Sequence, residues 1–325
     1  MGLTLITGGS GAGKTEYIYR KIIERSIKEP QSQFFIIVPE QSTMQEQKKL
    51  IRMHPSHGTM NIDTVSFERL AWRVFSELSM PQPEILDDTG KIMVLRKLAG
   101  EKRDELQAFS AHLSQTGFMN EIKSMLSEFY QYGVTPDLIR EQMGKAEMTP
   151  LLLRKLEDMN VIYGAFREFT KERYITLEEI LDVLCRVVER SRLLKNSVIL
   201  LDGYTGFTPV QYRLIGLLMG LSRELYVTVT IPESVELYEE GKESDLFDMS
   251  RKMAGKLRAL ANDRKIPVHE DIRLSGRPLK RFLNSPFLDH LERNMFRYPY
   301  HAYRGIPEGL SLTAAKNPAE EVELV

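Results

Sequence analysis

The fold of this chain is decided by residues 3–15, which read Leu3-Thr4-Leu5-Ile6-Thr7-Gly8-Gly9-Ser10-Gly11-Ala12-Gly13-Lys14-Thr15. The first five are apolar or β-branched and lead into glycines, which is typical of a buried strand. The last eight match the pattern G-x-x-x-x-G-K-[ST] at every fixed position. A helical stretch over residues 14–28 follows and ends before Pro30. A strand, a glycine-rich turn and a helix in this order predict a loop that binds phosphate groups.

The sequence after this loop alternates between strands and helices. Strands are predicted over residues 34–38, 60–66, 197–201 and 225–231, and helices over residues 41–53, 67–78 and 209–221. This alternation is typical of a parallel sheet whose faces are covered by helices. We therefore predict an α/β protein with the parallel sheet of a P-loop NTPase.

The alternation stops near Pro81 and Pro83. Residues 88–192 contain hardly a convincing strand, and helices are predicted over residues 92–98, 106–113, 118–130 and 151–169. The run Thr176-Leu177-Glu178-Glu179 fits a capping box that begins one more helix. About 100 residues of helix inside an α/β chain indicate a large all-helical insertion.

These changes divide the chain into four predicted segments. They are the first part of the core over residues 1–82, the helical insertion over 83–192, the second part of the core over 193–309 and the start of a further domain over 310–325. The last segment has a predicted strand at 310–314 and a helix that begins at 317–321 and stops before two turns are complete. We therefore expect the sequence to be a truncated piece of a longer protein.

The composition excludes several classes of protein. Of the 325 residues, 42% are hydrophobic and 27% are charged, which excludes a wholly disordered chain. Cys185 is the single cysteine, so the chain has no internal disulfide and no site built from several thiolates. No apolar run approaches the roughly 20 residues needed to cross a bilayer. We expect a soluble cytoplasmic protein without a membrane partner.

Charge is unevenly distributed, although the net charge is only −1. Residues 232–250 hold seven acids and one lysine, whereas residues 251–304 hold thirteen lysines and arginines against five acids. Such a run is usually a solvated surface. The alternative is a surface that contacts the backbone of a nucleic acid.

Each residue type in the glycine-rich loop suits phosphate binding. Glycines allow the backbone to turn with its N–H groups toward an anion at the start of a helix. Lys14 can reach the β- and γ-phosphates of a nucleotide, and the Thr15 hydroxyl can bind Mg²⁺. The predicted nucleotide-binding residues here are Gly8, Gly9, Ser10, Gly11, Ala12, Gly13, Lys14 and Thr15. The alternative is a glycine-rich turn that binds no ligand.

An acid at the end of another core strand would complete this kind of site. Asp202 follows the strand at 197–201, and we predict that it holds Mg²⁺ together with Thr15; the alternative is a turn at Gly203. Many ATP-hydrolysing proteins carry a glutamate directly after that aspartate, which deprotonates the attacking water. Gly203 has no side chain for this step, and Glu40 is a substitute by topology only, since an exposed acid or a helix cap is the simpler interpretation. We expect tight binding and weak hydrolysis.

The segment DGYTGFTPVQY at residues 202–212 resembles the D-E-x-Q-D-x-x-x-x-Q segment of UvrD-like superfamily-one helicases at identical spacing. Asp202 and Gln211 match, while Gly203, Thr205 and Gly206 replace the glutamate, the glutamine and the second aspartate. The opening LITGGSGAGKT and the segments VPEQST (38–43) and NIDTVSF (61–67) extend the likeness. Over essentially its whole length the chain resembles the AddB (RexB) subunit of bacterial AddAB helicase–nucleases.

The resemblance implies a RecA-like core with a helical insertion, and it adds Gln211 to the predicted nucleotide-binding residues. It implies that Thr64 and Ser66 touch the DNA backbone, with capping of the helix near residue 67 as the alternative for these two residues. It also implies an AddA-like motor and nuclease subunit as heterodimer partner, single-stranded DNA as ligand, and a role in double-strand-break repair and recombination. In such proteins the nuclease and the iron–sulfur cluster lie in a C-terminal part that we expect to be missing here.

Two departures from the helicase pattern weaken a motor role. The glutamine that reads adenine upstream of the loop has no counterpart, and residues 229–234 replace a G-D-x-x-Q motif. We therefore expect a degenerate motor that binds ATP and Mg²⁺. One competing interpretation is a P-loop kinase for a small molecule, with a lid built from Arg96, Lys97, Lys102 and Arg103. Another is a scaffold that binds no nucleotide. Trp72 and Cys185 are predicted to be core residues.

Overall fold

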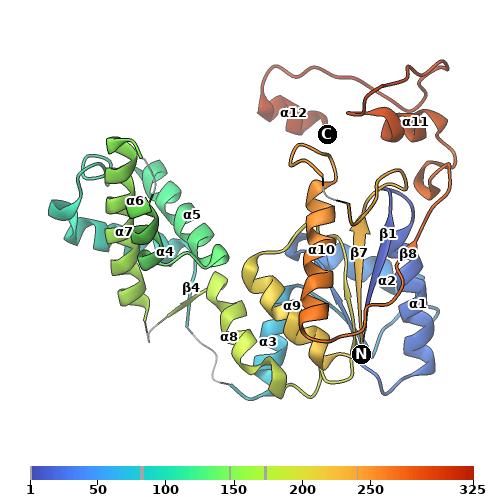
Figure 1. Ribbon diagram of the computed structural model, residues 1–325, viewed down its shortest axis with the longest axis horizontal. Helices are drawn as coiled ribbons and strands as arrows, with labels where there is room; N and C mark the ends of the chain where they lie inside the picture. The colour runs from blue at the N-terminus through green and yellow to red at the C-terminus, as the bar shows by residue number, and fades with distance from the viewer. Residues whose placement is uncertain (1, 81–83, 146–147, 172–173, 240) are drawn as a thin grey trace.

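Six parallel strands form the central sheet of the protein (Figure 1). The computed structural model describes residues 2–80, 84–145, 148–171, 174–239 and 241–325. The strands are β1 (Leu3–Gly8), β2 (Phe34–Ile37), β3 (Ile62–Val65), β6 (Val198–Leu201), β7 (Glu224–Thr230) and β8 (Ile272–Arg273). Their order is β3-β2-β6-β7-β1-β8, and every neighbouring pair is parallel. The prediction of an α/β protein with a parallel sheet is confirmed.

Alternate residues of the strands pack on opposite faces of the sheet. On one face, Ile6, Ile36 and Leu200 contact the apolar side of α1 (Lys14–Lys28) and of α2 (Thr43–Met53). On the other face, the helices are α3 (Phe67–Glu77), α8 (Ile180–Val187), α9 (Pro209–Leu221) and α10 (Asp248–Asp263). Burial of both faces explains the nearly continuous apolar runs that predicted these strands.

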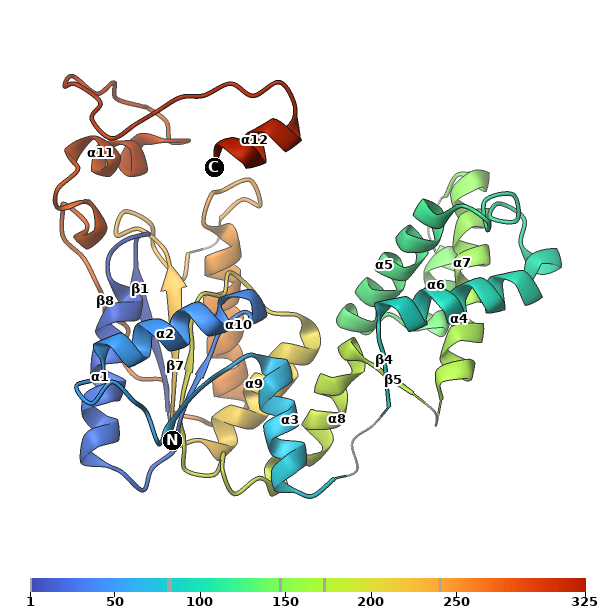
Figure 2. The ribbon, with the colours of Figure 1, turned by 180° about the vertical axis from the view of Figure 1, so that it is seen from behind.

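The helical region between β3 and β6 lies to one side of the sheet (Figure 2), and it has a hydrophobic core of its own. It consists of α4 (Asp88–Glu101), α5 (Thr116–Tyr132), α6 (Pro136–Lys145) and α7 (Pro150–Thr170). A short parallel pair, β4 (Ile85–Leu86) and β5 (Ile175–Thr176), joins the two chain segments that lead into and out of it. These two strands and β8 have only two residues each, too few for periodicity to predict them.

The predicted helix over residues 106–113 is wrong. That segment follows the 3₁₀ turn η2 (Arg103–Glu105) as a series of bends and turns. The carboxylate of Asp158, which is 1% exposed, accepts hydrogen bonds from three successive backbone N–H groups, those of Gln107, Ala108 and Phe109. A contact between residues about 50 positions apart therefore determines this loop, and local periodicity carries no signal of it.

Two other local predictions differ from the structure. The predicted strand at 310–314 is wrong, because this stretch is extended chain with no partner strand and Leu312 is 99% exposed. Only one of the two hydrogen bonds of the predicted capping box at residues 176–179 is present. The Glu179 carboxylate accepts the Thr176 N–H at 2.9 Å, but the Thr176 hydroxyl has no partner among the described residues. The 3₁₀ turn η3 (Leu177–Glu179) separates it from α8.

The remaining elements lie mostly toward the C-terminal end. They are α11 (Pro286–Asn294), α12 (Pro318–Leu324) and the 3₁₀ turns η1 (Glu40–Ser42), η4 (Val188–Arg190) and η5 (Lys280–Phe282). Helix α12 begins where the sequence predicts, capped by the Asn317 side chain. Trp72 is partly buried in the core, with its ring edge-on to Phe75, and Cys185 packs half-buried against the same core. In the described ranges, every helix is too short or too polar to span a bilayer.

Candidate functional site

The glycine-rich loop connects the carboxyl end of β1 to the first turn of α1. Gly11 and Gly13 have φ angles of +94° and +91°, a left-handed backbone that side chains disfavour. At Gly8 a Cβ atom would lie 2.9 Å from the Leu274 carbonyl oxygen. The first N–H groups of α1 have no intrahelical acceptor. The residues present therefore fit a phosphate group, since Gly8, Gly11 and Gly13 allow close approach to the loop backbone and the loop leads into the N–H donors at the start of α1.

Lys14 lies over this loop. Its ammonium group donates to the carbonyl oxygens of Gly8 at 2.9 Å and Gly9 at 3.0 Å. Burial lowers the pKa of Lys14 to about 8; the nearby Asp202 carboxylate opposes this shift, and the Arg281 guanidinium adds to it. A partly desolvated ammonium group with two exchangeable acceptors is suited to bind an anion.

Asp202 follows β6 and is buried at the carboxyl edge of the sheet. The Thr228 hydroxyl on β7 donates to its Oδ1 atom at 2.5 Å and accepts the Gly203 N–H at 3.4 Å. Gly203 has a φ angle of +81°. Among the residues that the structure describes, none donates a hydrogen bond to the other carboxylate oxygen, Oδ2. Oδ2 is therefore the atom that can hold a cation or its water.

The loop and Asp202 line one cleft of about 500 Å³, which we call the loop cleft. This volume is typical of small-molecule sites. The lining residues are Ser10, Gly11, Gly13, Lys14, Thr15, Glu16, Lys49, Asp202, Gly203, Tyr204, Thr228, Thr230, Lys280 and Arg281. The structure thus brings Asp202 together with five of the predicted loop residues, whereas Gly8, Gly9 and Ala12 do not line the cleft. It also adds three cations that motif matching missed, of which Lys280 and Arg281 belong to the basic stretch at 251–304.

Four other residues singled out in the sequence lie away from the loop cleft. Gln211 completes the capping box of α9: its Oε1 accepts the Thr208 N–H at 2.9 Å. Glu40 forms an ion pair with Arg69, and the Ser66 hydroxyl caps α3 by accepting the Arg69 N–H at 3.2 Å. The capping alternative for Ser66 is therefore observed. Thr64 lies on β3 with its hydroxyl buried and unpartnered.

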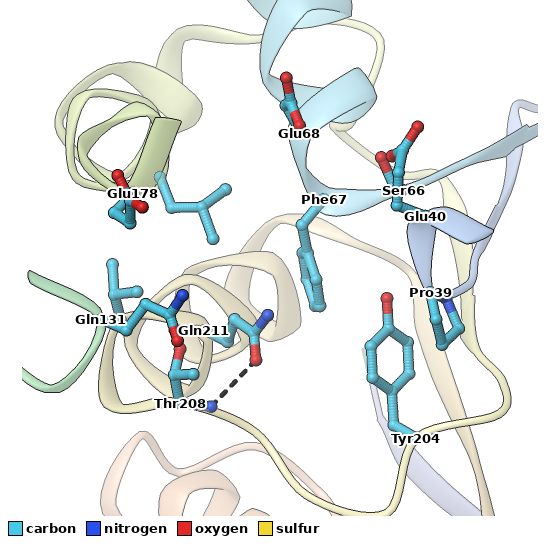
Figure 3. A pocket seen from close by; sticks show the side chains of 12 residues that line it. Pro39, Glu40, Ser66, Phe67, Glu68, Gln131, Glu178, Tyr204, Thr208 and Gln211 are labelled. Carbon is cyan, nitrogen blue, oxygen red and sulfur yellow. Dashed lines mark hydrogen bonds between the residues drawn. The ribbon is translucent and has the colours of Figure 1, made fainter. Parts of the chain in front are cut away.

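Gln211, Glu40 and Ser66 line a second cavity of about 430 Å³, which we call the acidic pocket (Figure 3). Its other lining residues are Pro39, Phe67, Glu68, Gln131, Glu178, Leu181, Tyr204, Thr208 and Val210. Figure 3 shows the rings of Phe67 and Tyr204 side by side, and their centroids are 5.5 Å apart. Tyr204 lines both cavities, so they are neighbours.

The acidic pocket joins the sheet core to the helical region. Gln131 and Glu178 come from the helical side, and the Lys91 ammonium group donates to both carboxylate oxygens of Glu178, at 2.9 and 2.8 Å. By contrast, the arginines and lysines proposed as a kinase lid bind elsewhere: Arg96 contacts Thr116, and Lys102 contacts Glu105. The loop cleft is lined by no residue of this set.

Comparison with known proteins identifies relatives along the whole chain. The family described as "ADDB, N-terminal" matches residues 5–292. A protein from Lachnoclostridium phytofermentans, named as the B subunit of an ATP-dependent helicase/deoxyribonuclease, is 44% identical over 324 residues, 99% of this chain and 28% of the relative. Proteins of the same name from Clostridium acetobutylicum and Caldanaerobacter subterraneus are 30% and 32% identical over 325 residues, with the same 28% of each relative covered. The chain therefore spans little more than a quarter of the length of these relatives.

Proposed function

The chain belongs to the family of AddB N-terminal regions, and on this premise we propose that it binds ATP with Mg²⁺ in the loop cleft and hydrolyses it slowly. The observation that carries the proposal is the convergence of Lys14, Thr15 and Asp202, from two distant segments, on one cleft beside the glycine-rich loop. The loop backbone and Lys14 would bind the β- and γ-phosphates.

Thr15 and Asp202 would hold the Mg²⁺ ion, which neutralises charge on the phosphates when bound. Thr228 supports this role because its hydrogen bond fixes the Asp202 carboxylate through Oδ1 and leaves Oδ2 for the ion. The side chains of Thr15 and Asp202 both offer oxygen atoms, the ligand type that Mg²⁺ prefers.

Slow hydrolysis is expected because each carboxylate that lines the loop cleft already has a partner. Among the described lining residues these are Glu16, which binds Lys280, and Asp202, which accepts the Thr228 hydroxyl. Glu40 lies in the other cavity and pairs with Arg69. A positioned general base typically contributes about 10²–10⁴ in rate, and the cleft offers no free carboxylate for that task.

The acidic pocket is the proposed contact for single-stranded DNA. The rings of Phe67 and Tyr204 offer surfaces on which an unstacked base can pack, and Glu178 and Gln131 offer polar groups for a base edge. Ser66 contributes here as a helix cap that positions Phe67. The direct backbone contact expected for Thr64 and Ser66 remains a proposal.

The wider context is proposed from the names of the relatives. We place the chain in one component of a helicase and deoxyribonuclease that acts in DNA repair and recombination in the cytoplasm, beside an AddA-like motor and nuclease subunit. Cys185 is the single cysteine of this sequence, too few for the cysteine ligands of an iron–sulfur cluster, so such a cluster would be held by residues outside these 325.

The test is binding of ATP with Mg²⁺ to the 325-residue chain by calorimetry, with turnover measured with and without single-stranded DNA. We expect saturable binding, loss of binding in Lys14→Ala, and turnover that stays slow when DNA is added. Rapid DNA-stimulated turnover, on the order of 10 s⁻¹ or faster, would overturn the degenerate motor. Identical thermal stability with and without nucleotide in both proteins would instead favour a scaffold.

A further inference from the structure

A basic segment contributes Lys280 and Arg281 to the lining of the loop cleft. Residues 277–282, which we call the basic strap, connect β8 to α11 (Figure 1). The Arg281 N–H donates to the Gly11 carbonyl oxygen at 3.0 Å. A Cβ atom built on Gly11 would lie 2.9 Å from Arg281 Cβ, and one on Gly13 would lie 3.0 Å from Lys280 Cδ. The basic strap therefore lies directly against the loop.

A buried acid anchors the basic strap on its outer side. Asp289 of α11 is 6% exposed and accepts hydrogen bonds from the Leu279 N–H at 3.2 Å and the Arg277 side chain at 2.9 Å. Arg293 donates to its second oxygen at 2.9 Å. This anchoring fixes the backbone around Lys280, so its side chain approaches the cleft from a rigid support.

The Lys280 side chain has an exchangeable partner at the cleft. Its ammonium group lies 2.6 Å from Glu16 Oε1, and Lys280 and Glu16 both line the cleft. Arg20 pairs with the same oxygen at 2.7 Å but does not line the cleft. The carboxylate of Glu16 would therefore keep one cation if the other moved to a ligand.

The charges of the cleft match those of the proposed ligand. The lining side chains comprise four cations, Lys14, Lys49, Lys280 and Arg281, and two carboxylates, Glu16 and Asp202. A nucleoside triphosphate carries about four negative charges, or about two once Mg²⁺ is bound. Lys280 and Arg281 of the basic strap are needed for this match, because Lys14 and Lys49 alone would only balance the two acids.

We propose that Lys280 is a phosphate-binding residue of the loop cleft, and that it exchanges the carboxylate of Glu16 for the phosphate chain of a nucleoside triphosphate. The inference rests on the proposed function and deepens it by adding a ligand-binding residue from a distant segment. It assigns Glu16 the opposite part, an anion that competes with the ligand for Lys280.

Opposite effects of two substitutions on affinity test the exchange. Affinity for ATP with Mg²⁺, and for inorganic tripolyphosphate, is measured by calorimetry on the 325-residue chain. Lys280→Ala should weaken binding about three- to tenfold, since the lost contact is charge-assisted but half exposed. Glu16→Gln should strengthen binding about two- to fivefold, because it removes the competing anion. Lys28→Ala, which removes an exposed lysine of α1 outside the cleft, is the control and should change affinity less than about twofold. Lys280→Arg should retain affinity.

The outcomes separate this inference from the proposed function. If the ion pair only holds the basic strap in place, Lys280→Ala and Glu16→Gln break the same contact and both weaken binding, which overturns the exchange. Unchanged affinity in Lys280→Ala also overturns it, while loss of binding in Lys14→Ala still supports a nucleotide site. If the parent protein binds neither probe, the proposed function and the inference fail together. Thermal midpoints of all variants show whether the fold is intact.

Discussion

The two neighbouring cavities differ in charge although they share Tyr204. The loop cleft is lined by four cations and two carboxylates, whereas the acidic pocket is lined by Glu40, Glu68 and Glu178 together with aromatic and aliphatic side chains. A phosphate chain is attracted to the loop cleft, whereas two of the three acids of the acidic pocket are already paired, Glu40 with Arg69 and Glu178 with Lys91. The difference agrees with the two proposed ligands, a polyphosphate in the loop cleft and an unstacked base of single-stranded DNA in the acidic pocket.

The cavities also differ in how they are assembled. The loop cleft is built around five residues of one strand-to-helix turn, and Asp202 and Thr228 meet them there because parallel strands end at one edge of the sheet. The acidic pocket collects short pieces of the core and of the helical region, with Glu178 held by the buried Lys91. A ligand in the acidic pocket would contact both regions, whereas one in the loop cleft would contact the core alone.

The largest expected effect is on the loop cleft. Lys14→Ala should weaken binding of ATP with Mg²⁺ about 100-fold, because it removes a partly buried charge that would be paired with phosphate. Calorimetry measures the change, and Lys28→Ala, on the exposed end of the same helix, is the control. Equal affinities of Lys14→Ala and parent would remove the distinction between the cavities.

The next largest effect is on the acidic pocket. Tyr204→Ala should weaken binding of a short single-stranded oligodeoxynucleotide about tenfold, since stacking on one aromatic ring contributes about 1–3 kcal/mol. Tyr204→Phe keeps the ring and should keep the affinity, and Tyr132→Ala, an exposed tyrosine outside both cavities, is the matched control. Fluorescence anisotropy measures binding. A larger loss of nucleotide affinity than of DNA affinity would assign Tyr204 to the loop cleft instead.

Local sequence predicts the turn but not its surroundings. The conformation of the loop depends on glycines at positions where the backbone is left-handed, and these glycines can be read directly from the sequence. Thr228, Lys49 and Lys280 come from three other segments, and only the excess of basic residues at 251–304 hinted at one of them. A motif match does not by itself place a residue in the loop cleft. Gln211 matches the helicase pattern, but it caps α9 and lines the acidic pocket.

In the fold too, the elements encoded by local sequence patterns were predictable, and a loop fixed by a distant residue was not. Buried parallel strands such as β2 and β6 are continuous apolar runs, so their positions follow from composition alone. The loop after α4 depends on Asp158, a single buried carboxylate about 50 residues away, and no periodic pattern encodes that contact. The helix predicted at 106–113 failed because this long-range contact fixes the segment, whereas the strand predicted at 310–314 failed because no other strand pairs with it.

A smaller effect is expected on the pH dependence of the loop cleft. Burial lowers the pKa of Lys14 to about 8, so the free protein loses the ammonium proton above that pH, and phosphate binding requires the proton to return. Affinity for ATP with Mg²⁺ should therefore be nearly constant below about pH 7 and fall about threefold between about pH 7.5 and 8.5. Calorimetry in buffers of different ionisation enthalpy should show proton uptake at the higher pH. The Lys14→Ala variant should lack this uptake, and its persistence there would assign the proton to another group.

The smallest effect on activity is expected at Gly203, where a glutamate would restore the helicase pattern. Gly203 has a φ angle of +81°, so any side chain strains the backbone by about 1–2 kcal/mol, although the nearest atom to a Cβ there, Pro39 Cδ, is 3.5 Å away. Gly203→Glu and Gly203→Ala should thus lower the free energy of unfolding by similar amounts, measured by urea denaturation. Neither should raise ATP turnover, since a strained turn does not direct the new carboxylate toward the phosphates. A rise in ATP turnover of more than about tenfold in Gly203→Glu alone would show that hydrolysis is limited by one missing base. That single side chain would then decide whether the loop cleft only binds ATP or also hydrolyses it.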